Sequence, residues 1–425
     1  MADLQKLERF SRLKERDITL FFQGRDDLLK DIDYACREAV ENIKAGEKTT
    51  SETRLFYGAP GAGKTSLLRE IEKRCQQNVG RTSAPIVVNL PSCQSLNKEE
   101  EVVLYIAQAI EKDTMFRTTT HSDTEMSASV FALLKGIARR GQVRNPPDAT
   151  FFNLGAMYND SALQRPIILC VDEIQGIGPD AKAMLSLLHQ GNHGLPIIPI
   201  YAGLGHSLQV LMEHEISRPV SGYIHSVGAL AKEEACAAVK AMFTAFQVEC
   251  SGAPYDWPTI LAERADCWPQ HLHNGMRALA RELARPEVNG VLRNVSIETI
   301  FTTEQAFRDE AYGWRISDTL RKTKKLVAQV MQHVTARPYD LEKVEALVLL
   351  LNKKSPSDPV LRSSSLPKDM DVSDYVNHMV HRGLLQEFIN SEKKVVLRCP
   401  IPSLATYVMN LGGVDPTHEP LIIKR

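Results

Sequence analysis

Gly58-Ala-Pro-Gly-Ala-Gly-Lys-Thr-Ser66 is the stretch that decides how the first half of this chain is expected to fold. It fits the phosphate-binding pattern G-x-x-x-x-G-K-[ST], in which glycines let successive backbone N–H groups point at phosphate oxygens. The lysine reaches the β- and γ-phosphates, and the threonine hydroxyl is placed for Mg²⁺. The residues expected at a nucleoside triphosphate are Gly58, Ala59, Pro60, Gly61, Ala62, Gly63, Lys64, Thr65 and Ser66.

The neighbours of this loop have the pattern that a phosphate site requires. An apolar strand, Leu55–Tyr57, precedes the loop, and a helix-forming run, Ser66–Cys75, follows it. The phosphates would therefore lie at the N-terminus of a helix, where backbone N–H groups and the helix dipole favour anions.

A second motif lies downstream, in Pro166-Ile-Ile-Leu-Cys-Val-Asp-Glu173. Its consecutive apolar residues are typical of a buried parallel strand, and its two carboxylates follow at the carboxyl end, where ligands bind in such sheets. Asp172 would hold Mg²⁺, directly or through water, and Glu173 would orient and deprotonate the attacking water. Either residue alone could instead cap the next helix.

Length and composition set the broad class of the protein. The chain has 425 residues, 43% of them hydrophobic and 24% charged, which predicts two or three globular domains. No apolar run approaches a membrane span, and the N-terminus lacks the layout of a signal peptide. Eight cysteines are scattered without zinc spacing. We therefore expect a cytoplasmic protein with no membrane partner.

Charge is distributed unevenly along the chain. Residues 315–425 contain 17 Lys and Arg against 12 Asp and Glu, whereas residues 1–314 contain 34 against 40. The basic excess at the C-terminal end is a modest indication of an anionic partner there, although a difference of this size can also arise by chance.

The order of the predicted elements gives the domain organisation. Apolar strands near 55–57, 86–90, 166–171 and 195–204 alternate with helices, which predicts an α/β unit over residues 1–225, with helices on both faces of a parallel sheet. Residues 226–314 show only helical patterns. Residues 315–425 contain a long basic helix over 317–335, then further helices and a hairpin of strands near 384–389 and 394–399.

Together these motifs resemble the AAA+ ATPases, in particular the branch of origin-recognition-complex-like initiators and related bacterial transposition, mobile-element and defence ATPases. The resemblance implies ATP and Mg²⁺ as ligands, a helical lid over residues 226–314 and a winged helix over 315–425. Phe22-Gln-Gly-Arg25 resembles the segment that lines the adenine pocket, so Phe22 and Arg25 are expected there. The 195–207 segment occupies the sensor-1 position and would bring His206 or Ser207 near the γ-phosphate, where the family usually has Asn or Thr.

Two further positions gain roles only from this resemblance. Glu215-Ile-Ser-Arg-Pro219 resembles the box that supplies an arginine finger to a neighbouring subunit, which would make Arg218 catalytic in trans and the active form a homo-oligomer. A surface arginine in a loop is the alternative. Cys267-Trp-Pro-Gln-His-Leu272 resembles the start of the sensor-2 helix, but Gln270 stands where the family has arginine. This departure puts rapid hydrolysis in doubt.

The C-terminal part resembles a winged helix whose recognition helix lies in Val372–Leu385. Its exposed face would offer Asn377, His378, His381 and Arg382, with Lys393, Lys394 and Arg398 on or near the wing. Such a face could enter a DNA groove, or it could be a protein-docking surface, since winged helices serve both purposes. Arg139, Arg140 and Arg144 are a second candidate for nucleic-acid contact, or a solvated helix end.

Three functions agree with these features. The first is an ATP-dependent switch that assembles subunits and engages DNA. The second is a signalling ATPase of the STAND type, in which the winged helix holds the nucleotide unit closed until a protein partner binds. The third, a metabolic kinase, fits poorly with the Asp-Glu pair and the two C-terminal units.

Overall fold

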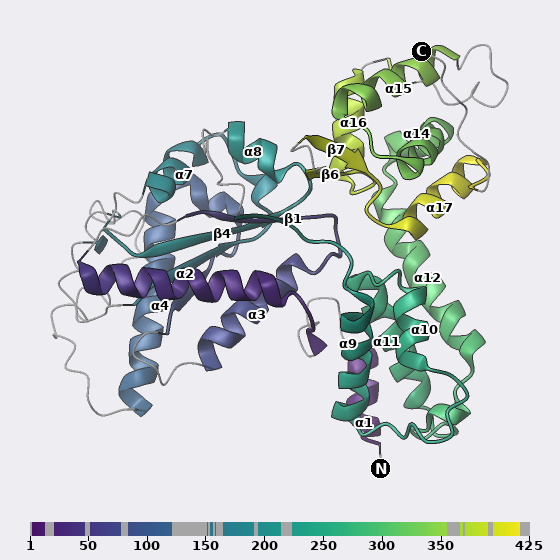
Figure 1. Ribbon diagram of the computed structural model, residues 1–425, viewed down its shortest axis with the longest axis horizontal. Coiled ribbons are helices and arrows are strands. Elements are labelled where there is room, and N and C mark those ends of the chain that lie inside the picture. The colour runs from purple at the N-terminus through teal and green to yellow at the C-terminus, as the bar shows by residue number, and fades with distance from the viewer. Residues whose placement is uncertain are drawn as a thin grey trace.

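In the computed structural model the chain forms two lobes (Figure 1). One side holds a β-sheet with its covering helices, and the other is a column built mainly of helices. The two predicted domain boundaries, after residues 225 and 314, stay predictions, and the helix α12 (Ile297–Arg315) ends next to the second of them. The described residues are 2–12, 21–46, 52–77, 84–120, 165–190, 194–213, 223–354, 366–368, 370–389 and 394–416, together with four positions between 151 and 158.

The described residues form one parallel sheet with the strand order β2-β3-β4-β1-β5. The P-loop, residues 58–66, follows the strand β1, which lies between β4 and the short strand β5. Apolar runs account for four of the strands, and β5 was not predicted because it has only three residues. The strands are β1 (Arg54–Tyr57), β2 (Ile86–Asn89), β3 (Ile167–Val171), β4 (Ile197–Gly203) and β5 (Ile224–Ser226).

Alternating side chains of these strands pack on opposite faces of the sheet. On one face, Phe56, Ile168 and Ile200 share a core with α2 (Asp26–Ala45) and α3 (Lys64–Gln77). The glycine-rich loop is thereby fixed between a buried strand and a helix that packs on that strand.

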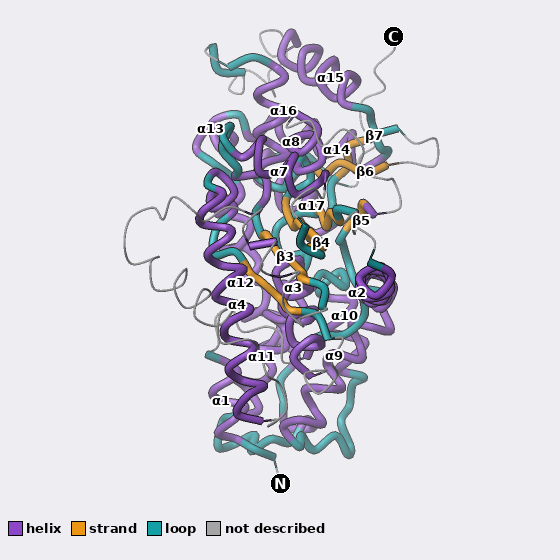
Figure 2. The backbone as a smooth tube through the Cα atoms, turned by 90° about the vertical axis from the view of Figure 1, so that its left-hand side faces the viewer, coloured by secondary structure: helices purple, strands orange, loops and turns teal. Residues whose placement is uncertain are grey.

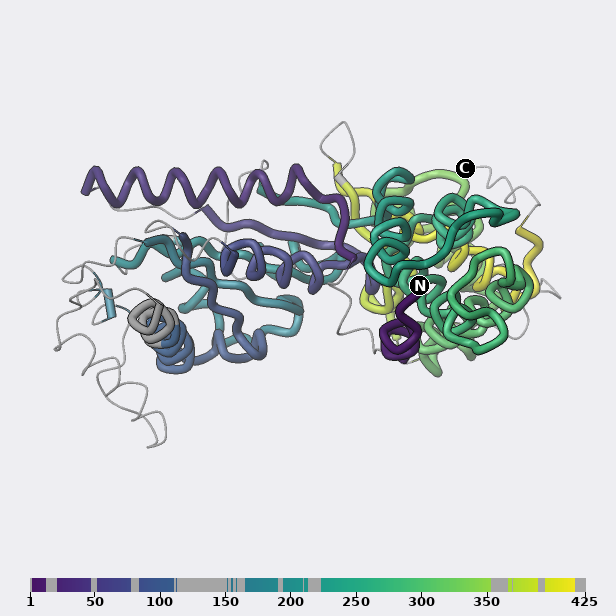
Figure 3. The backbone as a smooth tube through the Cα atoms, turned by 90° about the horizontal axis from the view of Figure 1, so that it is seen from below, coloured from purple at the N-terminus to yellow at the C-terminus, as the bar shows by residue number. Residues whose placement is uncertain are grey.

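The opposite face of the sheet has its own core. Leu55, Leu169 and Tyr201 pack there with α4 (Glu99–Thr120) and α7 (Ala181–Gln190). Figure 3 shows α2 along one side of the sheet and α4 along the other. The predicted α/β class, a parallel sheet with helices on both faces, is confirmed.

The lower part of the column, here called the helical unit, contains four helices after residue 226. They are α9 (Lys232–Phe246), α10 (Trp257–Arg264), α11 (Pro269–Leu283) and α12. The N-terminal helix α1 (Leu4–Ser11) packs against them rather than against the sheet, as Figure 2 also shows. Leu7 and Phe10 are buried in this core, and the backbone N–H of Asp3 donates to the carbonyl of Phe246 over 3.0 Å.

The described residues between 316 and 416 form the C-terminal unit above the helical unit. The helix predicted over 317–335 is divided at Thr323, whose hydroxyl bonds the Tyr375 hydroxyl over 2.6 Å and the Thr319 carbonyl over 3.0 Å. The predicted hairpin is present as an antiparallel pair. The elements are α13 (Asp318–Lys322), α14 (Lys324–Ala336), α15 (Leu341–Lys354), α16 (Val372–His381), β6 (Gln386–Ile389), β7 (Val395–Arg398) and α17 (Pro402–Gly412).

Some sequence predictions fall on residues outside the described part of the chain. These residues are the arginine-finger candidate Arg218, the basic cluster Arg139, Arg140 and Arg144, and Lys393 of the predicted wing. Their roles therefore stay predictions. Among the described helices, none is both long and apolar enough to cross a bilayer.

The packing of α1 gives a first testable prediction. Phe10→Ala should lower the free energy of unfolding by about 3–5 kcal/mol, the usual cost of emptying a buried aromatic site. Phe10 is 2% exposed, and its ring lies 5.5 Å from that of Phe246. Tyr34→Ala on α2 is the control, because Tyr34 is 55% exposed and should change stability by less than about 0.5 kcal/mol. Urea unfolding measures both, and equally small losses would contradict the packing of α1.

Candidate functional site

The P-loop turns sharply between β1 and α3. Gly61 and Gly63 have φ values of 80° and 92°, a backbone conformation that glycine adopts without strain. Gly58 is required for a different reason, because a Cβ there would collide with the carbonyl oxygen of Val227. The N–H of Gly58 donates to the Gly203 carbonyl over 3.0 Å, which anchors the loop to the end of β4.

Lys64 is the first residue of α3, and its side chain is buried under the loop. Its ammonium donates to the carbonyls of Gly58 over 2.8 Å and Ala59 over 3.1 Å. Burial lowers the pKa of Lys64 to about 8, while the nearby carboxylates Glu173 and Asp172 act in the opposite direction. A cation is thus held at the loop with acidic groups close by.

Thr65 and Asp172 meet at the carboxyl end of the sheet. The Thr65 hydroxyl donates to Asp172 Oδ2 over 2.6 Å, and Asp172 Oδ1 accepts the N–H of Glu173 over 2.9 Å. Within the described ranges, no group of three His, Cys, Asp or Glu side chains is placed to hold a metal ion by itself. A hydroxyl and a carboxylate oxygen are, however, donors that Mg²⁺ uses alongside phosphate oxygens and water. Thr65 and Asp172 are therefore the pair that fits Mg²⁺ at the phosphates.

Glu173 has a φ of 54°, an unusual value for a residue with a side chain. Its carboxylate accepts a hydrogen bond from the side-chain amide of Gln175. The amide oxygen of Gln175 in turn accepts the N–H of Leu204 over 3.0 Å. Gln175 therefore joins the acidic strand end to the segment after β4. Sequence reasoning missed it, although a polar residue directly after Asp-Glu-Ile was the available signal.

Phe22 and Arg25 lie beside a small cavity of about 60 Å³ next to the P-loop. Arg25 donates to the backbone carbonyls of Ala62 over 3.5 Å and Ala229 over 3.4 Å, and also to that of Gly228. Its side chain therefore ties the P-loop to the segment that leads into the helical unit. The other residues around this cavity include Ser66, Leu230 and Met276.

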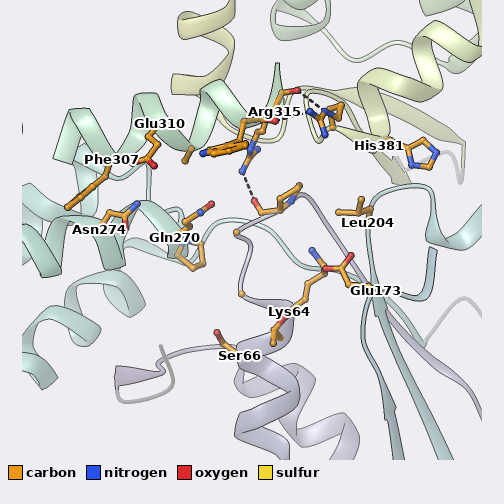
Figure 4. A pocket seen from close by; sticks show the side chains of 18 of the residues that line it. Lys64, Ser66, Glu173, Leu204, Gln270, Asn274, Phe307, Glu310, Arg315 and His381 are labelled. Atoms are coloured by element: carbon orange, nitrogen blue, oxygen red, sulfur yellow. Dashed lines mark hydrogen bonds between the residues drawn. The ribbon is translucent and has the colours of Figure 1, made fainter. Parts of the chain in front are cut away.

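A larger cavity of about 840 Å³ opens where the sheet, the helical unit and the C-terminal unit meet (Figure 4). Gln270 lines it at the start of α11, and its backbone N–H donates to the Gly61 carbonyl over 3.2 Å. Lys64, Thr65 and Glu173 line the same cavity. Of the predicted site residues, eight line this cavity: Pro60, Gly61, Gly63, Lys64, Thr65, Ser66, Glu173 and Gln270.

The C-terminal unit and the end of α12 contact the P-loop directly, an arrangement that among the predicted functions only the STAND-type alternative anticipated. The side-chain oxygen of Gln386, on β6, accepts the N–H of Ala59 over 2.8 Å. Arg315, at the end of α12, donates to the Pro60 carbonyl over 2.7 Å. A side chain at Gly383 would collide with Pro60, so glycine is required for this close approach.

Comparisons with known proteins bear on the fold. No model of a protein family and no curated protein matches the sequence. A Walker-type ATPase of Pyrococcus abyssi is structurally similar, with 15% identity, a TM-score of 0.54, and coverage of 92% of this chain and 99% of that one. The ADP form of the ORC2 protein of Aeropyrum pernix has 12% identity, a TM-score of 0.51, and coverage of 90% and 93%. The chain has an AAA+ fold.

Within this AAA+ fold, His206 packs against the C-terminal unit, a contact that the sensor-1 resemblance did not indicate. It is buried, and its ring centroid is 3.7 Å from that of His381 on α16. His381 lines the large cavity, whereas His206 is not among the residues around it. Neither ring nitrogen of His206 has a hydrogen-bond partner among the described residues. Burial and the neighbouring His381 lower the pKa of His206 to about 4.

Several residues of the predicted recognition face make contacts within the chain. His378 shares a hydrogen bond of 2.7 Å with the Ser317 hydroxyl. Arg382 donates to the carbonyls of Trp314 over 2.9 Å and Arg315 over 3.2 Å. These side chains therefore hold α16 against the end of α12 and the segment that follows it.

Other residues of the predicted DNA-binding surface are more accessible. Asn377 on α16 is half-buried, and Lys394, next to β7, is exposed. Arg398 is exposed as well, and its guanidinium lies 3.6 Å from the Phe388 ring centroid. The hairpin thus offers two exposed basic residues.

The contact between His206 and the C-terminal unit predicts a pH dependence. Because the folded-state pKa of His206 lies below its ordinary 6.5, the stability it contributes is present above pH 6.5 and is lost toward pH 4. His206→Phe should therefore make the urea midpoint fall less between pH 7 and pH 5. An unchanged difference between the two midpoints would contradict this prediction.

Glu387 on β6 should give stability the opposite pH dependence to that given by His206, and it therefore serves as the matched comparison. Burial raises its pKa from 4.5 to about 7, so its stabilising effect is lost as the pH rises through that range. Glu387→Gln should make the urea midpoint at pH 7 higher relative to that at pH 5. For each variant the measured quantity is the urea midpoint at pH 7 minus that at pH 5. A change of this difference in the same direction in both variants would be inconsistent with the two pKa directions.

Proposed function

We propose that this chain is an ATP-binding and ATP-hydrolysing switch that assembles with nucleotide and engages DNA through its C-terminal unit. The observation that carries the nucleotide part is the meeting of Lys64, Thr65, Asp172 and Glu173 at the carboxyl end of the sheet. Two sequence motifs more than a hundred residues apart supply these groups, and the Thr65–Asp172 distance of 2.6 Å joins them.

In this proposal each residue of the site has one role. The P-loop N–H groups and Lys64 bind the β- and γ-phosphates, and Thr65 and Asp172 hold Mg²⁺. Bound Mg²⁺ would neutralise charge on the phosphates. Glu173 would orient the attacking water and take its proton, and its contact with Gln175 fixes the position of the carboxylate.

The remaining predicted residues are proposed to complete the nucleotide site. Phe22 and Arg25 would lie near the adenine, which their place beside the small cavity supports. Gln270 would approach the phosphates from α11, supported by its place on the large cavity. Arg218 would complete the site of a neighbouring subunit, so the active form would be a homo-oligomer. His206 would act on the nucleotide indirectly, through its contact with the C-terminal unit.

DNA engagement is supported by the order of elements in the C-terminal unit and by the charge of residues 315–425. Three helices followed by an antiparallel hairpin fit a winged helix, with α16 as its recognition helix. Residues 315–425 carry 17 basic against 12 acidic side chains. Exposed Lys394 beside the hairpin is placed for a phosphate contact. We also propose a cytoplasmic location.

A second candidate function is a signalling ATPase whose C-terminal unit restrains the nucleotide unit. The observation that favours it is the 2.8 Å hydrogen bond from the N–H of Ala59 to Gln386. P-loop N–H groups are the donors that phosphates need. A partner protein that removed the C-terminal unit from the loop would then permit assembly.

Sedimentation separates the two candidates. The purified protein is measured with ATP, with ADP and without nucleotide, each with and without duplex DNA. Assembly that requires ATP and carries DNA with it supports the DNA-engaging switch. Assembly that ignores DNA supports the signalling switch. No nucleotide-dependent assembly in any condition would contradict both.

Substitutions test the roles at the phosphates. Lys64→Ala should weaken ATP binding on the order of 100-fold or more, because the cation facing the phosphates is lost. Glu173→Gln should leave ATP binding intact and slow hydrolysis by roughly 10²–10⁴-fold, the usual contribution of a general base. Isothermal titration and phosphate release measure the two effects.

Lys73→Ala is the control for Lys64, since Lys73 lies on the same helix and its side chain is 50% exposed. It should leave both binding and hydrolysis unchanged. Full ATPase activity in Glu173→Gln would show that the general base has been assigned wrongly.

A further inference from the structure

We propose that Arg315 contacts the γ-phosphate of bound ATP and that this contact weakens the attachment of the C-terminal unit to the P-loop. This inference rests on the proposed function, because it assigns a sensing residue to the same nucleotide site. Nothing in the sequence motifs pointed to Arg315, which lies at the end of α12, far along the chain from the P-loop.

The first argument is the placement of the guanidinium. Arg315 is only 6% exposed, yet it lines the large cavity together with Lys64, Thr65 and Glu173. Nη2 donates to the carbonyl of Pro60, in the part of the loop that precedes Lys64. Figure 4 shows this bond, with Arg315 and Lys64 both among the side chains around the cavity. Phosphates held by the loop would therefore lie on the side of the cavity that Arg315 faces.

The second argument is electrostatic. Arg315 and Lys64 are both buried cations whose side chains line the same cavity and donate to carbonyls of one loop. The two cations repel each other, and an anion bound between them is attracted by both, which offsets the repulsion. The γ-phosphate carries charge that ADP lacks, so Lys64 and Arg315 together favour the triphosphate. Gln270, the side chain that α11 places nearby, is neutral and cannot supply this charge.

The third argument is connectivity. Arg315 Nη1 lies 3.5 Å from the Gly383 carbonyl, and Arg382 donates to the backbone carbonyl of Arg315. A guanidinium has five N–H donors, so Arg315 can keep its bond to Pro60 while Nη1 turns to a phosphate oxygen. The long contact to Gly383 is the one that would be exchanged. The γ-phosphate would then weaken the attachment of the C-terminal unit to the loop.

Affinity measurements test this role. Isothermal titration measures the affinities for the β,γ-imido analogue of ATP and for ADP, both in the presence of Mg²⁺, in the unsubstituted protein and in Arg315→Gln. We expect the analogue to bind about 10- to 100-fold more weakly to Arg315→Gln, the loss of one charge-assisted hydrogen bond, and ADP less than about 3-fold more weakly. Arg315→Lys keeps the charge and should lose less than about 10-fold for the analogue.

Arg277→Gln is the matched control. Arg277 lines the same cavity, but its guanidinium lies 5.2 Å from the Phe307 ring centroid and donates to the Ser11 carbonyl. The ratio of the two affinities should stay unchanged in this variant.

Equal weakening of the analogue and ADP in the Arg315 variants would overturn the proposal, because it is what a residue that only supports the loop would cause. If Arg315→Gln does not fold, the same comparison in Arg315→Lys decides. Failure of the unsubstituted protein to bind either nucleotide would instead overturn the proposed function.

Discussion

The structure depends on how the P-loop is held from three sides. The sheet anchors Gly58 through the Gly203 carbonyl, the helical unit reaches Gly61 through the N–H of Gln270, and the C-terminal unit reaches Ala59 through Gln386. All three contacts are to backbone groups of one short loop. A movement of any of the three parts therefore changes hydrogen bonds to the same short loop. A phosphate bound to the loop would in turn affect the contacts of all three parts.

The charged groups at this site are buried, and burial of a charge has to be compensated. Lys64 and Arg315 are buried near a loop that offers carbonyl oxygens, and Asp172 and Glu173 lie within range of Lys64. Taking such groups out of water costs free energy unless they are paired or hydrogen-bonded. Here the loop carbonyls accept hydrogen bonds from both cations, so the charges can remain in place for an anion.

Much of the fold followed from the sequence because its signals are local. The apolar strands and the glycine pattern of the P-loop are visible within short stretches, and the Asp-Glu pair follows a buried strand directly. Contacts between distant parts were not predictable in the same way. Gln386 and Arg315 reach Ala59 and Pro60 across more than 250 positions, and no period or motif marks them. The packing of α1 on the helical unit was missed for the same reason.

The continuity of α12 has a mechanical consequence. Its 19 residues, Ile297–Arg315, make a rod of about 28 Å that begins in the helical unit and ends at the P-loop. Tilting such a rod by about 10° displaces its far end by roughly 5 Å, which is more than the length of a hydrogen bond. A small rearrangement among α9, α10 and α11 could therefore act as a lever on the nucleotide site without any element unfolding.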